Sequence, residues 1–458
     1  MPIFSFGQKQ DRVERMLRKM SVRDKVGQLF IVTYGQHTPD AQIEEAIKKD
    51  RVGGLIIMED EMEHYANRMN NYQKQSRIPL VISIDGEWGA SMRFDTLTQF
   101  PRNMQLGALS NTDMIYKVGR AMADQFRRVG VHINYAPTVD VNNNPNNPVI
   151  GQRSFGDNPQ KVAKYGAALI RGMQDGGVWT SAKHFPGHGD TDVDSHKALP
   201  TLPFDRARLD AMELYPFQEA INQDVWMVMV GHLNVPALDP TGMPSSLSYP
   251  IITKLLKEEM GFKGIVITDA LGMKGVSTYM PAELVPLASF KAGSDVLLMP
   301  AQSWHRSIKN VIKAVKKGEI SRERLDESVR KVLKMKEQLG LLDGTPFIDP
   351  KNIYEDTETK EEITVSDNAR TREADFALRI SGNSMEPRYH DGDILLVQEC
   401  ETVEFGELGI FILDGNGFFK VFGGDRLYSL NPEYGDILLK DFDDVRVAGK
   451  VIGKLKKR

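Results

Sequence analysis

The densest group of chemically active side chains lies in KHFPGHGDTDVDSH, Lys183–His196, which holds three histidines and three aspartates. The preceding VWTSA predicts a short buried strand. Pro186, Gly187 and Gly189 exclude a helix after Phe185. We therefore expect a polar loop at the end of a buried strand, which is where barrels and open α/β sheets carry their active sites.

One interpretation of this loop is a metal site, because imidazoles and carboxylates are common metal ligands. His184 and His188 are four residues apart, but the Pro and Gly between them remove the helical face that such a pair needs. The three aspartates imitate the start of a calcium loop. Its sixth position would be Ser195 instead of Gly and its twelfth Thr201 instead of Glu, so that pattern fails. We expect no metal here.

Two other interpretations stay open on the residues alone. The loop could be a solvated surface connection without a role. It could also be catalytic, with Asp194 orienting His196 as a proton donor. A carboxylate two residues away can contact one imidazole nitrogen, fix the tautomer of a histidine and raise its pKa.

The whole chain of 458 residues is long enough for more than one domain, and its formal net charge of −4 gives no sign of a nucleic-acid or membrane partner. The one cysteine, Cys400, excludes an internal disulfide framework. No apolar run approaches the roughly 18 residues of a membrane span. The start MPIFSFGQKQDRVERM lacks a signal-peptide core, so we expect a cytoplasmic protein, although a chain trimmed of an export signal would look the same.

Apolar, β-rich runs recur along the first three quarters of the chain, each followed by a helical pattern. The runs are GQLFIVT, VGGLIIM, LVISID, VHINYAP, VWTSAKH, WMVMVGH, GIVITDA and SDVLLMP. Near-continuous apolar strands that alternate with helices predict a parallel sheet covered on both sides. Eight such units predict the α/β class and a TIM-type (β/α)8 barrel, and a helix over SRERLDESVRKVLKMKEQLG, with Ser321 as its N-cap, follows the last run.

A barrel of this type carries its chemistry just past the C-terminal ends of its strands. Polar residues stand there in five consecutive runs: Asp85, Asp140, Lys183 with His184, His232 and Asp269. A random distribution would not place them all at the same end. Asp269 has two interpretations, a carboxylate held at the barrel mouth for chemistry or an N-cap of the following helix.

KHFPGHGDTDVDSH resembles the signature of family 3 glycoside hydrolases of the β-N-acetylglucosaminidase type. The resemblance implies Asp194 and His196 as the acid/base pair, where most glycosidases use a carboxylic acid. TDALGM resembles the family's nucleophile segment, which implies Asp269 as the nucleophile. The implied activity is a retaining exo-β-N-acetylglucosaminidase that acts on cell-wall (peptidoglycan) fragments through a glycosyl-enzyme intermediate, without a cofactor.

The resemblance also implies the residues that hold the sugar. DGEWGASMR resembles the family's substrate-binding turn and implies Asp85 and Arg93, although the family's turn is richer in Gly and Gln. Arg153 in GQRSFG and the pair Lys183 and His184 match further binding positions. Carboxylates accept hydrogen bonds from hydroxyl groups and cationic side chains donate them, which suits a carbohydrate substrate.

The composition changes after the closing helix. Residues 346–375 are rich in charge and turn formers and predict a linker between a barrel domain over 1–345 and a small all-β domain over 376–458. SGNSMEP, HDGDILLV and SLNPEY resemble the C-terminal domain of LexA-like repressors and S24 peptidases. The resemblance implies Ser384 as a nucleophile and Lys420 as its base, a pair that needs a lysine kept neutral by burial.

Two departures from the repressors put self-cleavage in doubt: no helix-turn-helix domain precedes this domain, and no Ala-Gly pair stands in the linker. Two rival functions stay open for the whole chain. One is a β-N-acetylglucosaminide phosphorylase, since a histidine tolerates an incoming phosphate better than a glutamate does. The other is a regulatory sugar-binding protein with a self-cleaving Ser-Lys domain. The sequence does not give the oligomeric state.

Overall fold

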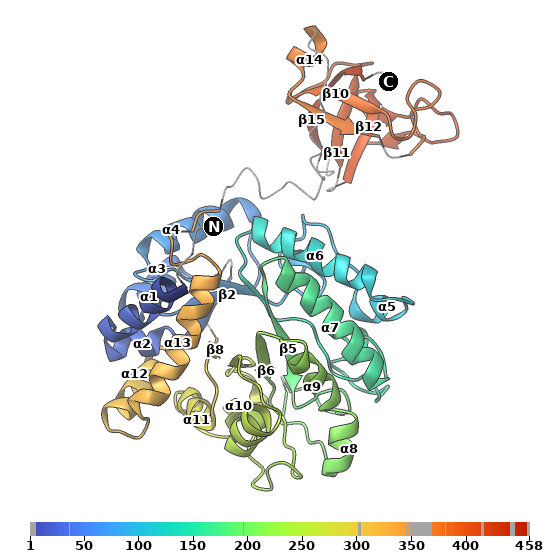
Figure 1. Cartoon of the computed structure of the whole chain (residues 1–458). Helices are drawn as coiled ribbons and strands as arrows, with labels where there is room; N and C mark the ends of the chain where they lie inside the picture. Colours follow the sequence, from blue (N-terminus) through green and yellow to red (C-terminus); the bar gives the residue numbers. More distant parts are fainter. Residues whose placement is uncertain are drawn as a thin grey trace. The chain divides into compact units, whose positions relative to one another are not determined.

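The computed structural model describes residues 6–35, 37–195, 197–300, 304–344, 346–348, 369–380, 382–413, 416–439 and 445–455. The chain divides into two compact units, Met1–Thr357 and Glu358–Arg458 (Figure 1), and each is described by itself. Most of the predicted linker, namely 349–368, lies outside the described residues, so the predicted domain limits stay a prediction.

The larger unit is built on eight parallel strands in the order β7-β6-β5-β4-β3-β2-β1-β8. Their bounds are β1 Phe30–Tyr34, β2 Gly54–Ile57, β3 Val81–Ile84, β4 Ile133–Asn134, β5 Trp179–Phe185, β6 Met227–Val230, β7 Ile265–Thr268 and β8 Leu297–Met299. A parallel bridge from Ile267 to Val296 links the two ends of the sheet. Six strands lie inside their predicted apolar runs, and β1 and β5 end one residue beyond theirs, so the predicted TIM-type barrel is confirmed.

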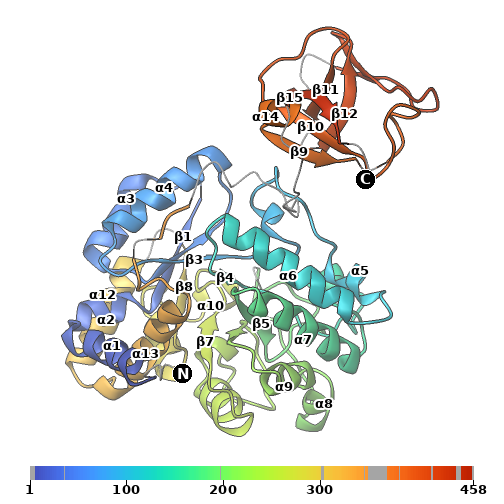
Figure 2. The same cartoon turned by 45° about the horizontal axis from the view of Figure 1, so that its top comes forward.

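Helices surround these strands on the outside (Figures 1 and 2). They are α1 Phe6–Lys19, α2 Val22–Gly27, α3 Asp40–Glu45, α4 Met62–Gln75, α5 Asn103–Gly107, α6 Asp113–Arg128, α7 Pro159–Asp175, α8 Arg206–Ala211, α9 Tyr215–Asn222, α10 Lys274–Ser277, α11 Val285–Ala292, α12 Trp304–Lys316 and α13 Arg322–Gln338. Shorter 3-10 and π turns are η1 Ala46–Asp50, η2 Ala90–Met92, η3 Gly151–Arg153, η4 Ser245–Leu247 and η5 Pro250–Glu259. None of the described helices is both long and apolar enough to cross a membrane.

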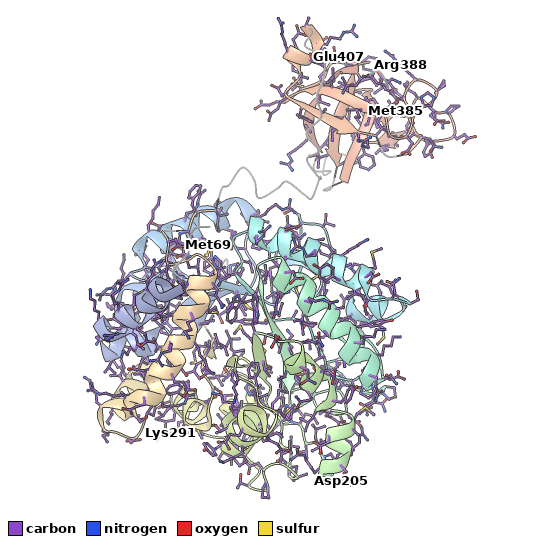
Figure 3. The ribbon with its side chains drawn as sticks, viewed as in Figure 1. Met69, Asp205, Lys291, Met385, Arg388 and Glu407 are labelled. Carbon is purple, nitrogen blue, oxygen red and sulfur yellow. The ribbon has the colours of Figure 1, made fainter. Side chains whose placement is uncertain are left out.

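Local sequence signals fix where several of these helices begin. Ser21 and Asp24 form a reciprocal capping box at the start of α2. The predicted N-cap Ser321 accepts a hydrogen bond from the Arg324 backbone at the start of α13. Asp205 caps α8 in the same way, at the outer edge of the barrel (Figure 3). These N-caps define the first residues of the three helices, and so the last residues of the loops that precede them.

The smaller unit is an antiparallel sheet in the order β14-β13-β12-β11-β15-β10-β9. Its elements are α14 Ala369–Glu373, β9 Phe376–Arg379, β10 Ile394–Gln398, β11 Leu408–Leu413, β12 Asn416–Phe422, β13 Arg426–Tyr428, β14 Ile437–Leu438 and β15 Val445–Lys454. Met385 is buried among Tyr389, Val397 and other apolar side chains of this unit (Figure 3). The predicted small β domain is confirmed.

A buried lysine, Lys336, lies at the end of the barrel where the strands begin. Lys336 of α13 donates from Nζ to the carbonyl of Gly53 at 2.9 Å, the carbonyl of Pro79 at 2.7 Å and Gln28 Oε1 at 2.6 Å. These acceptors precede β2, β3 and β1, so the amine joins the N-terminal ends of three neighbouring strands. Burial lowers the pKa of Lys336 to about 7.

Lys336 should make the stability of the barrel depend on pH. The unfolded lysine stays charged up to a pKa of about 10.4, so the unfolded state binds more protons between pH 7 and 10 and the folded state gains stability as the pH rises. The unfolding free energy of the wild type minus that of Lys336→Met should therefore increase by about 1–2 kcal/mol from pH 7 to pH 9. Urea titrations followed by the fluorescence of the four tryptophans, which all lie in the larger unit, measure this difference.

The exposed Lys48, which pairs with Glu44 on the surface, provides the control. The unfolding free energy of the wild type minus that of Lys48→Met should not change between pH 7 and pH 9. A flat difference for Lys336→Met would mean that the folded barrel keeps this amine protonated.

Candidate active site

Four charged side chains form a buried network where β3 and β5 end, here called the charged cluster: Asp85, Glu87, Arg153 and Lys183. Lys183 Nζ lies 2.8 Å from Asp85 Oδ1 and 2.9 Å from Glu87 Oε1. Arg153 donates to both oxygens of Glu87, at 2.7 Å from Nη2 and 3.0 Å from Nε. Three residues predicted from the resemblance are thus brought together by a fourth, Glu87, that was not predicted.

Glu87 stays ionised although its side chain is only 5% exposed. Burial alone would raise its pKa, but the Arg153 guanidinium and the Lys183 ammonium outweigh burial and hold the pKa of Glu87 well below its usual range. Burial lowers the pKa of Lys183, but the Asp85 and Glu87 carboxylates outweigh burial and raise it above its usual value, so Glu87 and Lys183 both carry charge. Glu87 stands inside the quoted turn DGEWGASMR, and its place beside Asp85 was the only sequence signal for it.

Arg93, the least secure of the predicted binding residues, lies at the edge of the charged cluster. Its Nη2 is 3.9 Å from Asp85 Oδ2, which is at the limit of an ion pair. Its Nε is buried and has no hydrogen-bond partner among the described residues. A buried donor without a partner is uncommon in folded proteins.

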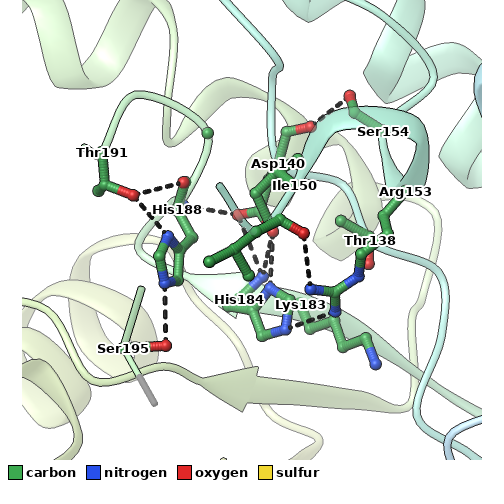
Figure 4. Close-up of polar contacts among 12 residues, drawn as sticks. Thr138, Asp140, Ile150, Arg153, Ser154, Lys183, His184, His188, Thr191 and Ser195 are labelled. Atoms are coloured by element: carbon green, nitrogen blue, oxygen red, sulfur yellow. Dashed lines mark hydrogen bonds and ion pairs between the residues drawn. The ribbon is translucent and has the colours of Figure 1, made fainter. Parts of the chain in front are cut away.

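Asp140, which follows β4, binds both the last part of β5 and the loop after β5 (Figure 4). Its Oδ2 lies 2.7 Å from His184 Nδ1, and its Oδ1 accepts from the His188 backbone at 2.7 Å. Arg153 Nη2 is 3.2 Å from His184 Nε2. Because a guanidinium only donates, Nε2 accepts this bond and Nδ1 carries the proton that goes to Asp140. The predicted residue His184 is therefore held in one tautomer by a carboxylate and a guanidinium.

Asp269 follows β7 directly, at the same end of the barrel. Its backbone N–H donates to Val230 at 2.9 Å, and its Oδ1 accepts from the Ala270 backbone at 2.7 Å. Burial raises its pKa, but His232, His184, the Ala270 backbone and Lys183 outweigh burial, so the pKa of Asp269 is lowered and the carboxylate stays ionised. The next helix, α10, begins at Lys274 with Met273 as its N-cap, so the interpretation of Asp269 as a helix cap is wrong.

His232, at the end of β6, supports the backbone beside Asp269. Its Nε2 donates to the carbonyl of Ala270 at 3.1 Å, and its Nδ1 lies 2.7 Å from Ser246 Oγ. The sequence singled out His232 by its position alone. The structure gives it a contact next to the carboxylate at the end of β7.

The loop after β5 is not a solvated connection. His188, Thr191 and Ser195 are buried, and the side chains of Asp190 and Asp192 accept hydrogen bonds from the Asn-rich segment that follows β4. The surface-loop interpretation is therefore wrong. In the described part of the chain, no three His, Cys, Asp or Glu side chains group as a metal site would.

The predicted acid/base pair is seen only in part. The backbone carbonyl of Asp194 accepts from the Lys197 and Ala198 backbones at 2.8 and 3.1 Å, which forms a turn at this point. His196 lies outside the described residues. The pairing of the two side chains stays a prediction.

The smaller unit brings its two predicted residues together. Lys420 of β12 donates from Nζ to Ser384 Oγ at 2.7 Å and to Ser429 Oγ at 3.0 Å. Lys420 has no ion pair among the described residues, and burial lowers its pKa. Ser429 was not predicted, although it opens the quoted SLNPEY.

Models of two known families match the two units of the chain. The model described as "Glycosyl hydrolase family 3 N terminal domain" matches residues 21–335. The chain belongs to glycosyl hydrolase family 3. The model described as "Peptidase S24-like" matches residues 346–452.

Individual relatives are similar over the barrel. "Beta-hexosaminidase A" of Pseudoalteromonas piscicida is 35% identical over 65% of this chain, and the match spans 55% of that relative, little more than half its length. The structure of a family 3 β-N-acetylglucosaminidase from Paenibacillus sp. str. FPU-7 is 34% identical with a TM-score of 0.69, covering 80% of this chain and 71% of that one. A structure titled "Beta-glucoside phosphorylase BglX" is 25% identical with a TM-score of 0.71, over 78% and 65% of the two chains.

Glu87 should be essential to the charged cluster. In Glu87→Gln, Arg153 and Lys183 lose the carboxylate that they share. Removing one partner of a buried ion pair is strongly destabilising, so we expect a loss of about 3 kcal/mol in the free energy of unfolding of the barrel. Urea titration of the purified variant measures this loss.

The matched control is Glu45→Gln, which breaks an exposed pair with Lys49 on the surface. An exposed pair of this kind contributes little to stability, because solvent and salt screen it. If the two variants were equally stable, Glu87 would not hold the charged cluster together.

Proposed function

We propose that the barrel is a retaining exo-β-N-acetylglucosaminidase that removes terminal β-GlcNAc from cell-wall (peptidoglycan) fragments. The single observation that carries the proposal is the ionised Asp269 carboxylate at the end of β7, at the same mouth of the barrel as the charged cluster. The similar proteins named as a β-hexosaminidase and a β-N-acetylglucosaminidase support the choice of sugar.

In the first step the Asp269 carboxylate attacks the anomeric carbon, and the bond to the aglycone oxygen breaks as His196 gives that oxygen a proton. Asp194 orients the imidazole and stabilises its cation. In the second step the neutral His196 takes a proton from water, the water oxygen bonds to the anomeric carbon, and Asp269 leaves as a carboxylate. The charge on Asp269 is ready for the first step because its pKa is lowered.

The sugar itself would be held by the predicted binding residues. Asp85 accepts hydrogen bonds from hydroxyl groups, and Lys183, Arg153 and the free Nε of Arg93 donate them. Because Glu87 holds Lys183 and Arg153, and Lys183 holds Asp85, before any ligand arrives, the sugar would meet a preformed site.

A phosphorylase is the competing assignment for the same barrel. The similarity to a structure titled as a β-glucoside phosphorylase is the observation that favours it. The two differ only in the acceptor of the second step. Turnover of a GlcNAc glycoside with and without inorganic phosphate distinguishes them, since a hydrolase gives free GlcNAc in both cases and a phosphorylase gives GlcNAc 1-phosphate.

A second activity is proposed for the smaller unit. Lys420 Nζ at 2.7 Å from Ser384 Oγ has the geometry of a base that takes the serine proton as the hydroxyl attacks an acyl carbon. Burial lowers the pKa of Lys420, which favours the neutral amine that this role needs. The absence of an Ala-Gly pair from the linker argues for a substrate other than the chain's own linker.

Asp269→Asn should nearly abolish turnover of a chromogenic GlcNAc glycoside. The amide cannot form the glycosyl-enzyme, and the loss of a covalent nucleophile reduces kcat by roughly 10³-fold or more. Asp205→Asn is the control. Asp205 is an exposed N-cap of α8, asparagine can cap the helix as well, and this variant should stay as active as the wild type. Activity of Asp269→Asn within tenfold of the wild type would remove Asp269 from this role.

Asp194→Ala and His196→Ala should differ in their dependence on the leaving group. His196→Ala removes the proton donor, so alkyl and disaccharide substrates should slow far more than dinitrophenyl glycosides, whose leaving group needs no proton. Asp194→Ala keeps the imidazole and loses its orientation, so its penalty should be smaller, roughly 10²-fold. Measured kcat/KM over a leaving-group series decides between this pair and another donor, because equal losses on all substrates would exclude His196.

Ser384 should react with a fluorophosphonate, a probe of activated serine hydroxyls. Labelling of the intact chain, measured by mass, should disappear in Ser384→Ala and fall at least about tenfold in Lys420→Met, because the hydroxyl then lacks its base. Lys450→Met, at a partly exposed lysine paired with Glu407, is the control. Unchanged labelling in Lys420→Met would show that the dyad is not active.

A further inference from the structure

His188 is a buried imidazole that takes no part in the charged cluster. Its side chain is 1% exposed, and both ring nitrogens contact hydroxyl groups of its own loop. Nδ1 lies 2.8 Å from Thr191 Oγ1, and Nε2 lies 3.0 Å from Ser195 Oγ (Figure 4). The ring thus bridges two points of the loop that are four residues apart.

The direction of each bond follows from the Thr191 hydroxyl. Thr191 Oγ1 donates its one proton to the carbonyl of His188 at 3.1 Å, so it accepts from Nδ1–H of the same residue. Nε2 is then without a proton and accepts from Ser195 Oγ. Burial lowers the pKa of His188 to about 4, so the imidazole stays neutral and keeps this acceptor at neutral pH.

His188 itself is fixed by the frame that holds the charged cluster. Its backbone N–H donates to Asp140 Oδ1 at 2.7 Å, and its carbonyl accepts from Asn147 Nδ2 at 2.8 Å. Asp140 also binds His184, which contacts Arg153. The ring is therefore set in position by the groups that hold the sugar-binding side chains.

Ser195 is the point where this frame meets the segment after Asp194. Its side chain is 2% exposed and donates to the imidazole on one side. On the other side its carbonyl accepts at 3.0 Å from the backbone of Gly275, in the helix that follows β7 and Asp269. A Cβ at Gly275 would lie 3.0 Å from this carbonyl oxygen, which is closer than most Cβ contacts, so the two backbones are packed tightly here.

A buried serine beside a histidine has the composition of a nucleophile with its base, but this pair cannot act in that way. A nucleophile must reach its substrate, and Ser195 is buried with its hydroxyl directed at the imidazole. The contacts of both residues are structural and lead from the charged cluster to the segment that carries Asp194.

We propose that His188 and Ser195 are positioning residues that hold the Asp194 segment in register with the sugar-binding residues and with Asp269. The inference rests on the proposed glycosidase function, in which Asp194 belongs to the acid/base pair. Loss of the His188–Ser195 bond should therefore impair proton donation to the leaving group and leave the attack of Asp269 nearly unchanged.

Three variants of the full chain test the inference. Ser195→Ala removes only the hydroxyl, His188→Leu removes both ring contacts, and His188→Gln places an amide oxygen near the position of Nε2. For Ser195→Ala and His188→Leu, kcat/KM on alkyl and disaccharide β-GlcNAc substrates should fall about ten- to a hundredfold, the size expected when a catalytic group is misplaced by about 1 Å. On dinitrophenyl β-GlcNAc the loss should stay within about threefold.

His188→Gln should recover most of the activity that His188→Leu loses on the unactivated substrates. A side chain that only filled the space of the imidazole, without an acceptor for Ser195, would not restore it. The double variant of Ser195→Ala and His188→Leu should be no worse than the more impaired single variant, because both break the same bond. Ser328→Ala is the matched control, because it deletes another fully buried serine hydroxyl. Ser328 lies on α13 and donates to Asp295 at 2.6 Å, and its loss should not change the ratio of kcat/KM between the two substrate classes.

The outcomes separate the inference from the proposed function. If Asp194→Ala slows unactivated substrates selectively while Ser195→Ala and His188→Leu slow both classes equally or neither, the inference is wrong and the proposed function stands. If Asp194→Ala shows no selectivity, the acid/base assignment fails and the inference fails with it. A selective loss in Asp194→Ala, Ser195→Ala and His188→Leu, with recovery in His188→Gln, supports both.

Discussion

A carboxylate without access to water survives in a folded protein only where donors surround it, and Asp140 is the carboxylate on which this barrel mouth depends. It accepts from the His184 ring, the His184 backbone and the His188 backbone, while its own side chain is fully buried. Through these three bonds one residue after β4 sets the orientation of a binding side chain and the path of the loop that follows β5. The residues proposed for sugar binding and the loop proposed for proton transfer therefore share one support.

The two ends of the barrel handle buried charge in opposite ways. At the mouth, Glu87 lies between Arg153 and Lys183, so each charge has an opposite partner and all of them stay ionised. At the base, Lys336 has only neutral oxygens around it, and burial brings its pKa down to about 7. Paired charges give the mouth a permanent field that can bind hydroxyl groups, whereas the base carries a charge that neutral pH can remove.

Much of the architecture followed from the sequence, because apolar runs and polar strand ends are local patterns. All eight barrel strands, the position of Asp269 and the Ser384 motif belong to this class. Asp140 was noticed only by its position, and the roles of Glu87 and Ser429 were missed. The reason is physical: a buried polar side chain is defined by its partners, and Arg153 lies 66 residues from Glu87 along the chain. The order of residues does not say which donor a carboxylate will meet.

Gly189 limits how the loop after β5 can vary in sequence. A Cβ at this position would lie 1.8 Å from the carbonyl oxygen of Val141, so any other residue would push the loops after β4 and β5 apart. Variation is instead open at Val193, which is 39% exposed between Asp192 and Asp194. A substitution at Val193 would therefore change the outer surface of this loop and leave the hydrogen-bonded frame beneath it unchanged.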